Sequence, residues 1–256
     1  VVASPIDAQL IETAILSQIN HQSLIATKAR RIVKAADGRS VFDFGARRAH
    51  NLDAAIYGAR AAYIGGADGT ATVLAAKAFG IPTTGTMAHS WVMYFGDEFE
   101  AFKRYALLYP DSASLLVDTY DVLHSGVPNA IKTAKEVLEP LGKRLKAVRL
   151  DSGDLAYLSK KTRAMLDAAG LQDCKITVSN SLDEYTIASI LAQGGQIDGF
   201  GVGERLITSK SDPVFGGVYK LVAVENKGIF SPRIKVSEAV EKMTNPGLKK
   251  VWRIYK

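Results

Sequence analysis

Cysteine is almost absent from this chain of 256 residues, which contains only Cys174. A single thiol excludes an internal disulfide framework and a zinc site built from several cysteines. The chain also has no apolar run near the roughly 20 residues that a helix needs to cross a bilayer. No secretory signal peptide is recognisable at the start, where the first residue is Val1. These absences favour a cytoplasmic protein with no membrane partner.

Long runs of positive charge are absent as well, although Lys and Arg outnumber Asp and Glu by 32 to 26. The densest early cluster lies within residues 26–34 and is typical of the solvent-exposed face of a helix. Because no basic motif with interleaved aromatic residues accompanies it, a nucleic-acid partner is the least favoured interpretation. The net charge of +6 suits a small phosphorylated substrate equally well.

Strand and helix patterns alternate along most of the chain. The first helix is expected from Pro5 to about Gly38, with Ile11, Ile15 and Ile19 on one face. Strands about 30 residues apart with helices between them predict a parallel sheet. The predicted strands lie within residues 41–44, 81–86, 114–118, 146–150, 175–179 and 197–203, and the helices between them at about 53–64, 70–79, 97–109, 127–138, 154–169 and 183–193.

Polar residues or glycine follow almost every predicted strand, and they favour a barrel over an open sheet. In a barrel they all surround one mouth, whereas an open sheet places its site at a single crevice. We therefore expect an α/β fold, an irregular (β/α) TIM-like barrel, with about six recognisable strands rather than eight. The residues concerned are Arg47, His89, Asp118, Asp151, Asn180 and Gly201.

The pattern changes after Gly216. Residues 216–226 are typical of a β-segment, and a turn at residues 245–247 precedes a β-rich end at 251–255. We interpret residues 1–215, including the N-terminal helix, as the barrel domain. Residues 216–256 are then a return segment into a second α+β domain that is incomplete in this chain.

His89 is one of only four histidines, and it follows a predicted strand at the mouth. An isolated histidine is often a hydrogen-bonded structural residue. Its position favours instead a base, a metal ligand or a phosphoryl acceptor. No HExxH spacing accompanies it, so we predict no protein metal ligands.

Three further motifs carry groups suited to a phosphorylated sugar. FDFGARRAH combines a flat ring, Phe44, with two arginines whose guanidinium groups match phosphate and carboxylate. RLDSGDL places Asp151 at a strand end, while its Asp154 is also a plausible helix cap. The glycines of GFGVGERL, which include Gly201 and Gly203, allow backbone N–H groups to approach an anion.

Five motifs in this order and spacing resemble the nicotinate phosphoribosyltransferase family: FGARRAH, AAYIGGADGTATVLA, GTMAHSW, VRLDSGDL and GFGVGERLIT. The resemblance extends over essentially the whole chain, with Ala46 and Asn51 as small departures. It implies an irregular barrel and a second domain built from the N-terminal segment and a later return of the chain. It also leads us to expect that about a quarter or more of the enzyme lies outside this sequence.

The resemblance further implies a reaction of nicotinate, 5-phosphoribosyl 1-pyrophosphate and ATP, with Mg²⁺, that yields nicotinate mononucleotide. His89 would be phosphorylated by ATP, and the expected assembly is a homodimer with shared active sites. Nicotinamide and quinolinate phosphoribosyltransferases and a non-catalytic phosphosugar-binding barrel remain alternatives. By the same resemblance, the pyridine ring would be bound by Phe44, Arg47 and Asp68, and the ribose by Arg149 and Asp151. The 5-phosphate would be bound by Gly201 and Gly203, and further substrate contacts would come from Ser90 and Asn180.

Overall fold

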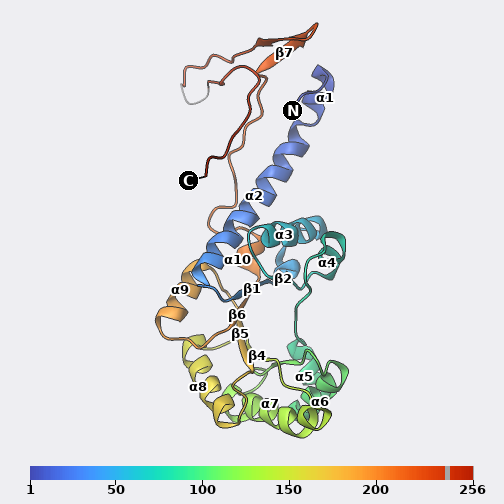
Figure 1. Cartoon of the computed structure of the whole chain (residues 1–256), viewed down its shortest axis with the longest axis vertical. Coiled ribbons are helices and arrows are strands. Elements are labelled where there is room, and N and C mark those ends of the chain that lie inside the picture. The colour runs from blue at the N-terminus through green and yellow to red at the C-terminus, as the bar shows by residue number, and fades with distance from the viewer. Residues whose placement is uncertain (240–242, 256) are drawn as a thin grey trace. The chain divides into compact units, whose positions relative to one another are not determined.

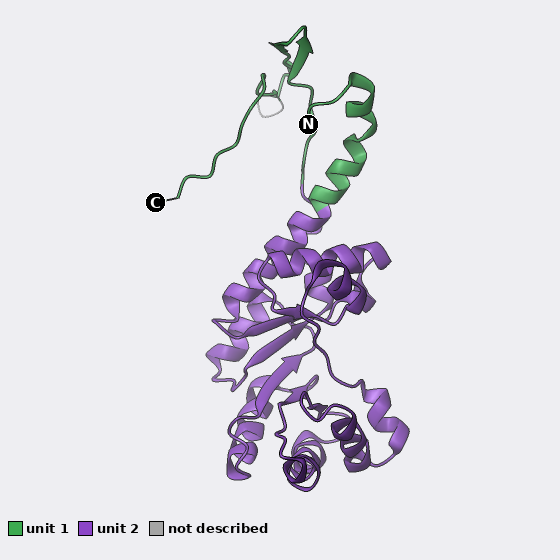
Figure 2. Cartoon of the chain, turned by 45° about the vertical axis from the view of Figure 1, so that its right-hand side comes forward, with its two compact units in different colours: residues 1–20, 216–256 green, residues 21–215 purple. Residues whose placement is uncertain are grey.

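The computed structural model describes residues 1–239 and 243–255. Contacts within the chain divide it into two compact units, residues 1–20 with 216–256 and residues 21–215 (Figure 2). The larger unit contains the parallel sheet and all the residues for which the sequence suggests a function. The fold of that unit decides which of them can act together.

Six parallel strands form one curled sheet in the larger unit, in the order β2-β1-β6-β5-β4-β3 (Figure 1). β1 and β6, the first and last of these six strands along the chain, pair with each other. The order is therefore that of a cylinder opened between β2 and β3 rather than of a doubly wound sheet. The α/β fold with a parallel sheet is thus confirmed, while β2 and β3 do not pair with each other among the described residues. The strands are β1 Ser40–Asp43, β2 Gly69–Thr70, β3 Ser114–Leu116, β4 Ala147–Leu150, β5 Lys175–Ser179 and β6 Gly199–Val202.

Helices connect these strands, and several begin at an aspartate or asparagine that caps them. Asp154 accepts a hydrogen bond from the backbone of Tyr157, and Asp183 forms a capping box with Thr186. The helices are α1 Pro5–Leu10, α2 Glu12–Ala35, α3 Leu52–Ile64, α4 Val73–Phe79, α5 His89–Phe95, α6 Glu98–Leu108, α7 Val127–Thr133, α8 Leu155–Ala168, α9 Glu184–Ala192 and α10 Glu204–Ile207. Single turns of 3-10 or π helix cover Ala46–Arg48, Val122–Gly126, Ala134–Leu138 and Glu139–Leu141.

The two faces of the sheet differ in chemistry. On one face, aliphatic side chains such as Val148, Ile176 and Val202 are fully buried in the hydrophobic core. Successive residues of a strand point to opposite faces, so the alternate residues form the other face. That inner face carries small, polar and aromatic residues: Ser40, Phe42, Arg149, Thr177, Ser179, Gly199 and Gly201.

The segment around β2 corrects two expectations. Residues 81–86 contain a single bridge, between Thr70 and Thr83, instead of the predicted strand. Thr70, predicted to start a helix, belongs to β2 and is tied to β1 by a hydrogen bond of 2.7 Å to Asp43. Pro82 has no N–H to donate, so it offers only its carbonyl to Thr70. Pairing over so few residues leaves no strand-length apolar pattern in the sequence.

The smaller unit contains one β-hairpin, β7 Ala223–Asn226 and β8 Ile229–Pro232, among its described residues. Lys227 and Gly228 both have positive φ, as a tight two-residue hairpin turn requires. The hairpin covers only the end of the predicted β-segment at 216–226, and residues 251–255 form no strand, contrary to expectation. None of the described helices is both long and apolar enough to cross a membrane.

Candidate active site

His89 lies between two carboxylates that follow neighbouring strands. Its Nε2 is 3.5 Å from Asp151 Oδ2, just after β4, and 3.8 Å from Asp118 Oδ1, after β3. Its Nδ1 is 3.3 Å from Thr119 Oγ1. The imidazole is the first side chain of α5 and is 40 % exposed, so it is accessible to a ligand. The structure therefore brings His89 and Asp151 together, as expected for residues at one mouth.

Asp118 is the more buried of the two carboxylates, with a side chain only 1 % exposed. Its Oδ2 accepts a hydrogen bond of 2.5 Å from Ser152, but Oδ1 has no hydrogen-bond partner among the described residues. Gly126 packs against the backbone just before Asp118: a Cβ at this glycine would lie 1.8 Å from the Val117 carbonyl oxygen. From the sequence we expected Asp118 at the mouth but predicted no role for it. In the structure, the carboxylate oxygen without a hydrogen-bond partner lies beside His89.

Arg149 and Asp151 form an ion pair with an N–O distance of 3.1 Å, and Ser179 of the next strand joins them. Arg149 Nε donates to Ser179 Oγ at 2.8 Å, and Ser179 donates in turn to Asp151. Burial by itself would raise the pKa of Asp151. The Arg149 charge and the hydrogen bonds from Ser179, Arg149 and His89 outweigh burial and lower that pKa below its usual value. Asp151 is therefore held as a carboxylate at neutral pH.

Phe44 provides a flat surface at the same end of the sheet. The Arg149 guanidinium lies 5.1 Å from the centre of its ring, within cation–π distance. A Cβ at Gly201 would lie 2.4 Å from the ring, so glycine is needed for the ring to rest on β6. This packing explains Gly201 independently of any phosphate, and its phosphate-binding role stays a prediction.

A small pocket of about 190 Å³ adjoins this network and gathers positive charge. Among its lining residues, Arg205 is paired with Asp183, and Lys210 lies 3.4 Å from Glu204. Asn180 and Ser181 have φ of 89° and 50°, a strained backbone that is common at functional sites. The pocket also contains predicted residues: it is lined by Phe44, Arg47, Arg48, Arg149, Asp151, Ser179, Asn180, Ser181, Leu182, Gly201, Gly203, Glu204, Arg205 and Lys210.

Three predicted residues are not among those that line this pocket: His89, which lies beside Asp151, and also Asp68 and Ser90. Asp68 accepts a hydrogen bond of 2.8 Å from the backbone N–H of Val41, at the start of β1. Ser90 is exposed on the first turn of α5, next to His89. Their substrate contacts stay predictions. In contrast, sequence reasoning missed Ser179 and Thr86, whose hydroxyl groups hold Arg149.

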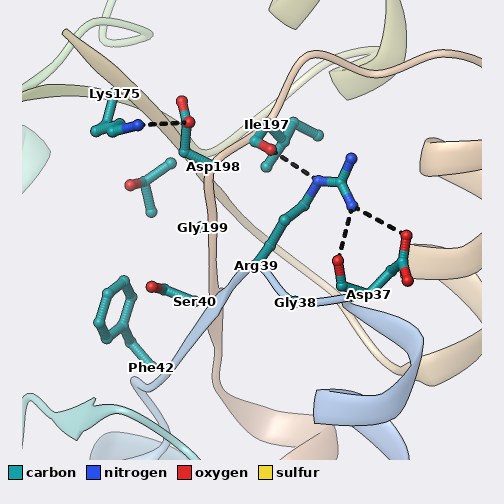
Figure 3. A pocket seen from close by; sticks show the side chains of 10 residues that line it. Asp37, Gly38, Arg39, Ser40, Phe42, Lys175, Ile197, Asp198 and Gly199 are labelled. Carbon is teal, nitrogen blue, oxygen red and sulfur yellow. Dashed lines mark hydrogen bonds and ion pairs between the residues drawn. The ribbon is translucent and has the colours of Figure 1, made fainter. Parts of the chain in front are cut away.

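A larger cavity of about 600 Å³ lies at the amino end of the sheet (Figure 3). Its charged groups are matched to partners within the cavity wall. Arg39 donates to the Ile197 carbonyl at 2.9 Å, and Lys175 lies 3.2 Å from Asp198. Because none of the predicted site residues lines this cavity, it is a weaker candidate than the smaller pocket beside His89.

Metal-binding side chains do not cluster in the part of the chain that the structure describes: no three His, Cys, Asp or Glu residues are placed to hold one ion. The absence of protein metal ligands stays a prediction. A Mg²⁺ ion at this site would have to take most of its oxygen ligands from phosphate groups and water, as this ion commonly does.

Comparison with known proteins decides the family. The model of the "Nicotinate phosphoribosyltransferase (NAPRTase) family" matches residues 39–232. The chain belongs to the nicotinate phosphoribosyltransferase family. A nicotinate phosphoribosyltransferase of Bacillus subtilis is 53 % identical over 251 residues, which are 97 % of this chain and 50 % of that protein. Nicotinate phosphoribosyltransferase pncB2 of Mycobacterium tuberculosis is 52 % identical over 254 residues, or 98 % of this chain and 52 % of that protein.

Solved structures agree with this assignment. The crystal structure of human nicotinic acid phosphoribosyltransferase matches with a TM-score of 0.69 and 30 % identity, over 76 % of this chain and 50 % of that one. A nicotinate-nucleotide pyrophosphorylase from Pyrococcus furiosus matches with a TM-score of 0.65 and 36 % identity, over 77 % and 50 %. The chain thus spans about half the length of these relatives of the nicotinate phosphoribosyltransferase family.

Proposed function

We propose that this chain carries the catalytic cluster of a nicotinate phosphoribosyltransferase, an enzyme of NAD salvage. It would join nicotinate to 5-phosphoribosyl 1-pyrophosphate, giving nicotinate mononucleotide and pyrophosphate, with ATP hydrolysed to ADP and phosphate. The observation that carries the proposal is the position of His89, accessible and flanked by Asp118 and Asp151 within the segment that matches the family. The high identity to nicotinate phosphoribosyltransferases supports the choice of nicotinate.

The surroundings of His89 suit a phosphoryl acceptor. A neutral imidazole carries its proton on one nitrogen and a lone pair on the other. The two carboxylates beside Nε2 favour the proton there, which leaves the lone pair on Nδ1. In this proposal Nδ1 attacks the γ-phosphorus of ATP, so an N–P bond forms and the bond to the ADP oxygen breaks. Hydrolysis of the N–P bond later releases phosphate.

The groups around the pocket suit the transfer of the phosphoribosyl group. As pyrophosphate leaves, positive charge builds on the ribose ring, and the ionised Asp151 stabilises it electrostatically. Phe44 offers a stacking face for the pyridine ring, and Arg47 a partner for its carboxylate. Mg²⁺, if bound together with pyrophosphate, would supply positive charge that stabilises the leaving group.

Further parts of the proposal concern the protein as a whole. We expect the curled sheet to belong to an irregular TIM-like barrel, with residues 1–215 in the barrel domain and 216–256 in the return segment. A homodimer with shared active sites, a cytoplasmic location and the roles of Asp68, Ser90, Asn180, Gly201 and Gly203 also stay proposals. The match to about half of each relative supports the expectation of further chain.

The experiment is transfer of label from [γ-³²P]ATP to the full-length protein. We expect acid-labile, base-stable label on wild type and none on His89→Ala, which would keep slow, ATP-independent transfer. His124→Ala is the matched control, because His124 is 86 % exposed and pairs with Asp121 rather than with Asp118 or Asp151. Equal ATP stimulation of wild type and His89→Ala would remove His89 from the mechanism. Turnover of nicotinamide or quinolinate in preference to nicotinate would contradict the assigned substrate.

A further inference from the structure

Ser179 belongs to none of the recognised motifs, yet it lies at the centre of the polar network. It is the last residue of β5 and only 3 % exposed. Its hydroxyl is both an acceptor and a donor: it accepts a hydrogen bond from Arg149 Nε and donates one to Asp151 Oδ1. A single buried hydroxyl thus connects a cation and an anion that both come from the neighbouring strand, β4, or the residue just after it.

The partners of Arg149 show that its guanidinium group is held from several sides. Besides Ser179, it donates to Thr86 Oγ1 at 3.0 Å and to Asp151 Oδ1 at 3.1 Å. Its flat group also lies over the Phe44 ring. Loss of the Ser179 hydroxyl would therefore leave Arg149 attached through Thr86 and Asp151. It would remove from Asp151 a partner that is rigidly placed by the sheet.

The two oxygens of Asp151 have separate partners. Oδ1 receives hydrogen bonds from Ser179 and Arg149, while Oδ2 is directed to His89 Nε2 at 3.5 Å. A carboxylate can rotate about its own axis, and hydrogen bonds to one oxygen limit that rotation. We propose that Ser179 is a positioning residue, which fixes the Asp151 carboxylate so that Oδ2 faces His89. Its effect on catalysis rests on the proposed function.

Electrostatics gives this role a measurable signature. Burial raises the pKa of Asp151, and the charge of Arg149 with the hydrogen bonds from Ser179, Arg149 and His89 lowers it further than burial raises it. The charged groups that face Asp151 are Arg149 on β4 and His89 on α5, and Asp118 lies 3.8 Å from the same His89 nitrogen, Nε2. Removal of the Ser179 hydroxyl takes away one stabilising donor and leaves these charges in place, so the Asp151 pKa must rise.

The test combines kinetics with direct titration of Asp151 in the full-length protein. In Ser179→Val, we expect kcat to fall about tenfold, the size of effect that loss of one hydrogen bond to a charged group produces. The carboxyl ¹³C resonance of Asp151 should titrate at higher pH than in wild type, and the acid limb of kcat/KM should move in the same direction. Ser179→Thr, with the same shape as Val and a hydroxyl group, should restore both. Thr177→Val, two residues earlier on the same face of β5, should change neither.

The outcomes separate this role from a structural one and from the proposed function. An unchanged Asp151 titration in Ser179→Val, or equal behaviour of the Thr and Val variants, would overturn the positioning role. The titration needs no substrate, so it tests Ser179 even in a protein without turnover. Absence of phosphoribosyl transfer by wild type would instead refute the proposed function.

Discussion

The two ends of the parallel sheet contain similar residue types but use them differently. At the amino end, Arg39 and Lys175 interact with a backbone carbonyl and with Asp198, which lie on the adjoining strand or loop. At the carboxyl end, charged groups from three separate segments meet, and Asp118 Oδ1 there has no hydrogen-bond partner among the described residues. The amino-end cavity is larger by volume, about 600 against 190 Å³. The unpartnered carboxylate oxygen, rather than the cavity volume, distinguishes the candidate site from the structural cleft at the amino end.

The largest expected difference between the two ends is in turnover. Asp151→Asn keeps the shape but removes the charge, so kcat should fall about 10²–10³-fold, as when a transition-state electrostatic partner is lost. The matched variant Asp198→Asn at the amino end should alter kcat less than about twofold, because Asp198 only holds Lys175 and the Ile176 N–H. Steady-state kinetics of the full-length protein decides, and an equal loss in both variants would erase the distinction.

Two glycines of β6 allow a second, more specific comparison between the two ends of the sheet. A Cβ at Gly201 would lie 2.4 Å from the Phe44 ring, whereas one at Gly199 would lie 3.2 Å from the Phe42 ring. Gly201→Ala should therefore displace Phe44 and raise KM for nicotinate about tenfold, with overpacking that costs about 1–3 kcal/mol of stability. Gly199→Ala should leave KM unchanged and cost less stability. Initial-rate kinetics and urea denaturation measure the two quantities, and a KM effect from Gly199→Ala would contradict the comparison.

At acid pH, protonation of Asp183 should destabilise the fold at the carboxyl end of the sheet. Burial raises the pKa of Asp183, but hydrogen bonds from Thr186 and Arg205 lower it below the ordinary 3.8. A lowered pKa means that the ionised form stabilises the fold above that value, and the contribution is lost as pH falls further. Asp183→Asn should cost about 1–2 kcal/mol at pH 7, since it weakens a helix cap and an ion pair. Urea denaturation should show this difference shrinking below pH 3.8, and a difference independent of pH would contradict the assignment.

The smallest effect is expected at the amino end, from Cys174. Burial raises the pKa of this thiol from 9.0 to about 12. Its protonated form therefore contributes stability that is complete below pH 9.0 and declines as pH rises toward about 12. Cys174→Ala should lower stability at pH 7 by about 1 kcal/mol and flatten this alkaline decline, with kcat unchanged. Reaction with a thiol reagent at pH 8 without denaturant would contradict the burial.

Sequence reasoning succeeded where a single segment carries its own signal. The strands within 114–118, 146–150 and 175–179 were recognisable because their apolar runs end at polar residues, and all three are present in shortened or full form. The two-residue strand β2 was missed, since its pairing depends on Asp43 and Pro82, which are distant in sequence.

The same distinction applies to the site. Asp151 was recognisable from its position after a strand and Arg149 from the family motif, whereas the strand expected before His89 forms only a single bridge. Ser179 was not recognisable, because a hydroxyl at a strand end is common and gains a role only when β5 lies beside β4. Asp118 was recorded at the mouth, but its unpartnered oxygen depends on burial that no local pattern predicts.

The contact of Gly126 with Val117 restricts how this protein can vary. The backbone carbonyl occupies the space that any side chain would need, at 1.8 Å, and the next residue along is Asp118. A methyl group could enter only if the end of β3 moved, which would carry the carboxylate away from the imidazole. In a saturation library selected for activity, position 126 should accept glycine alone, although it lies on a helical turn.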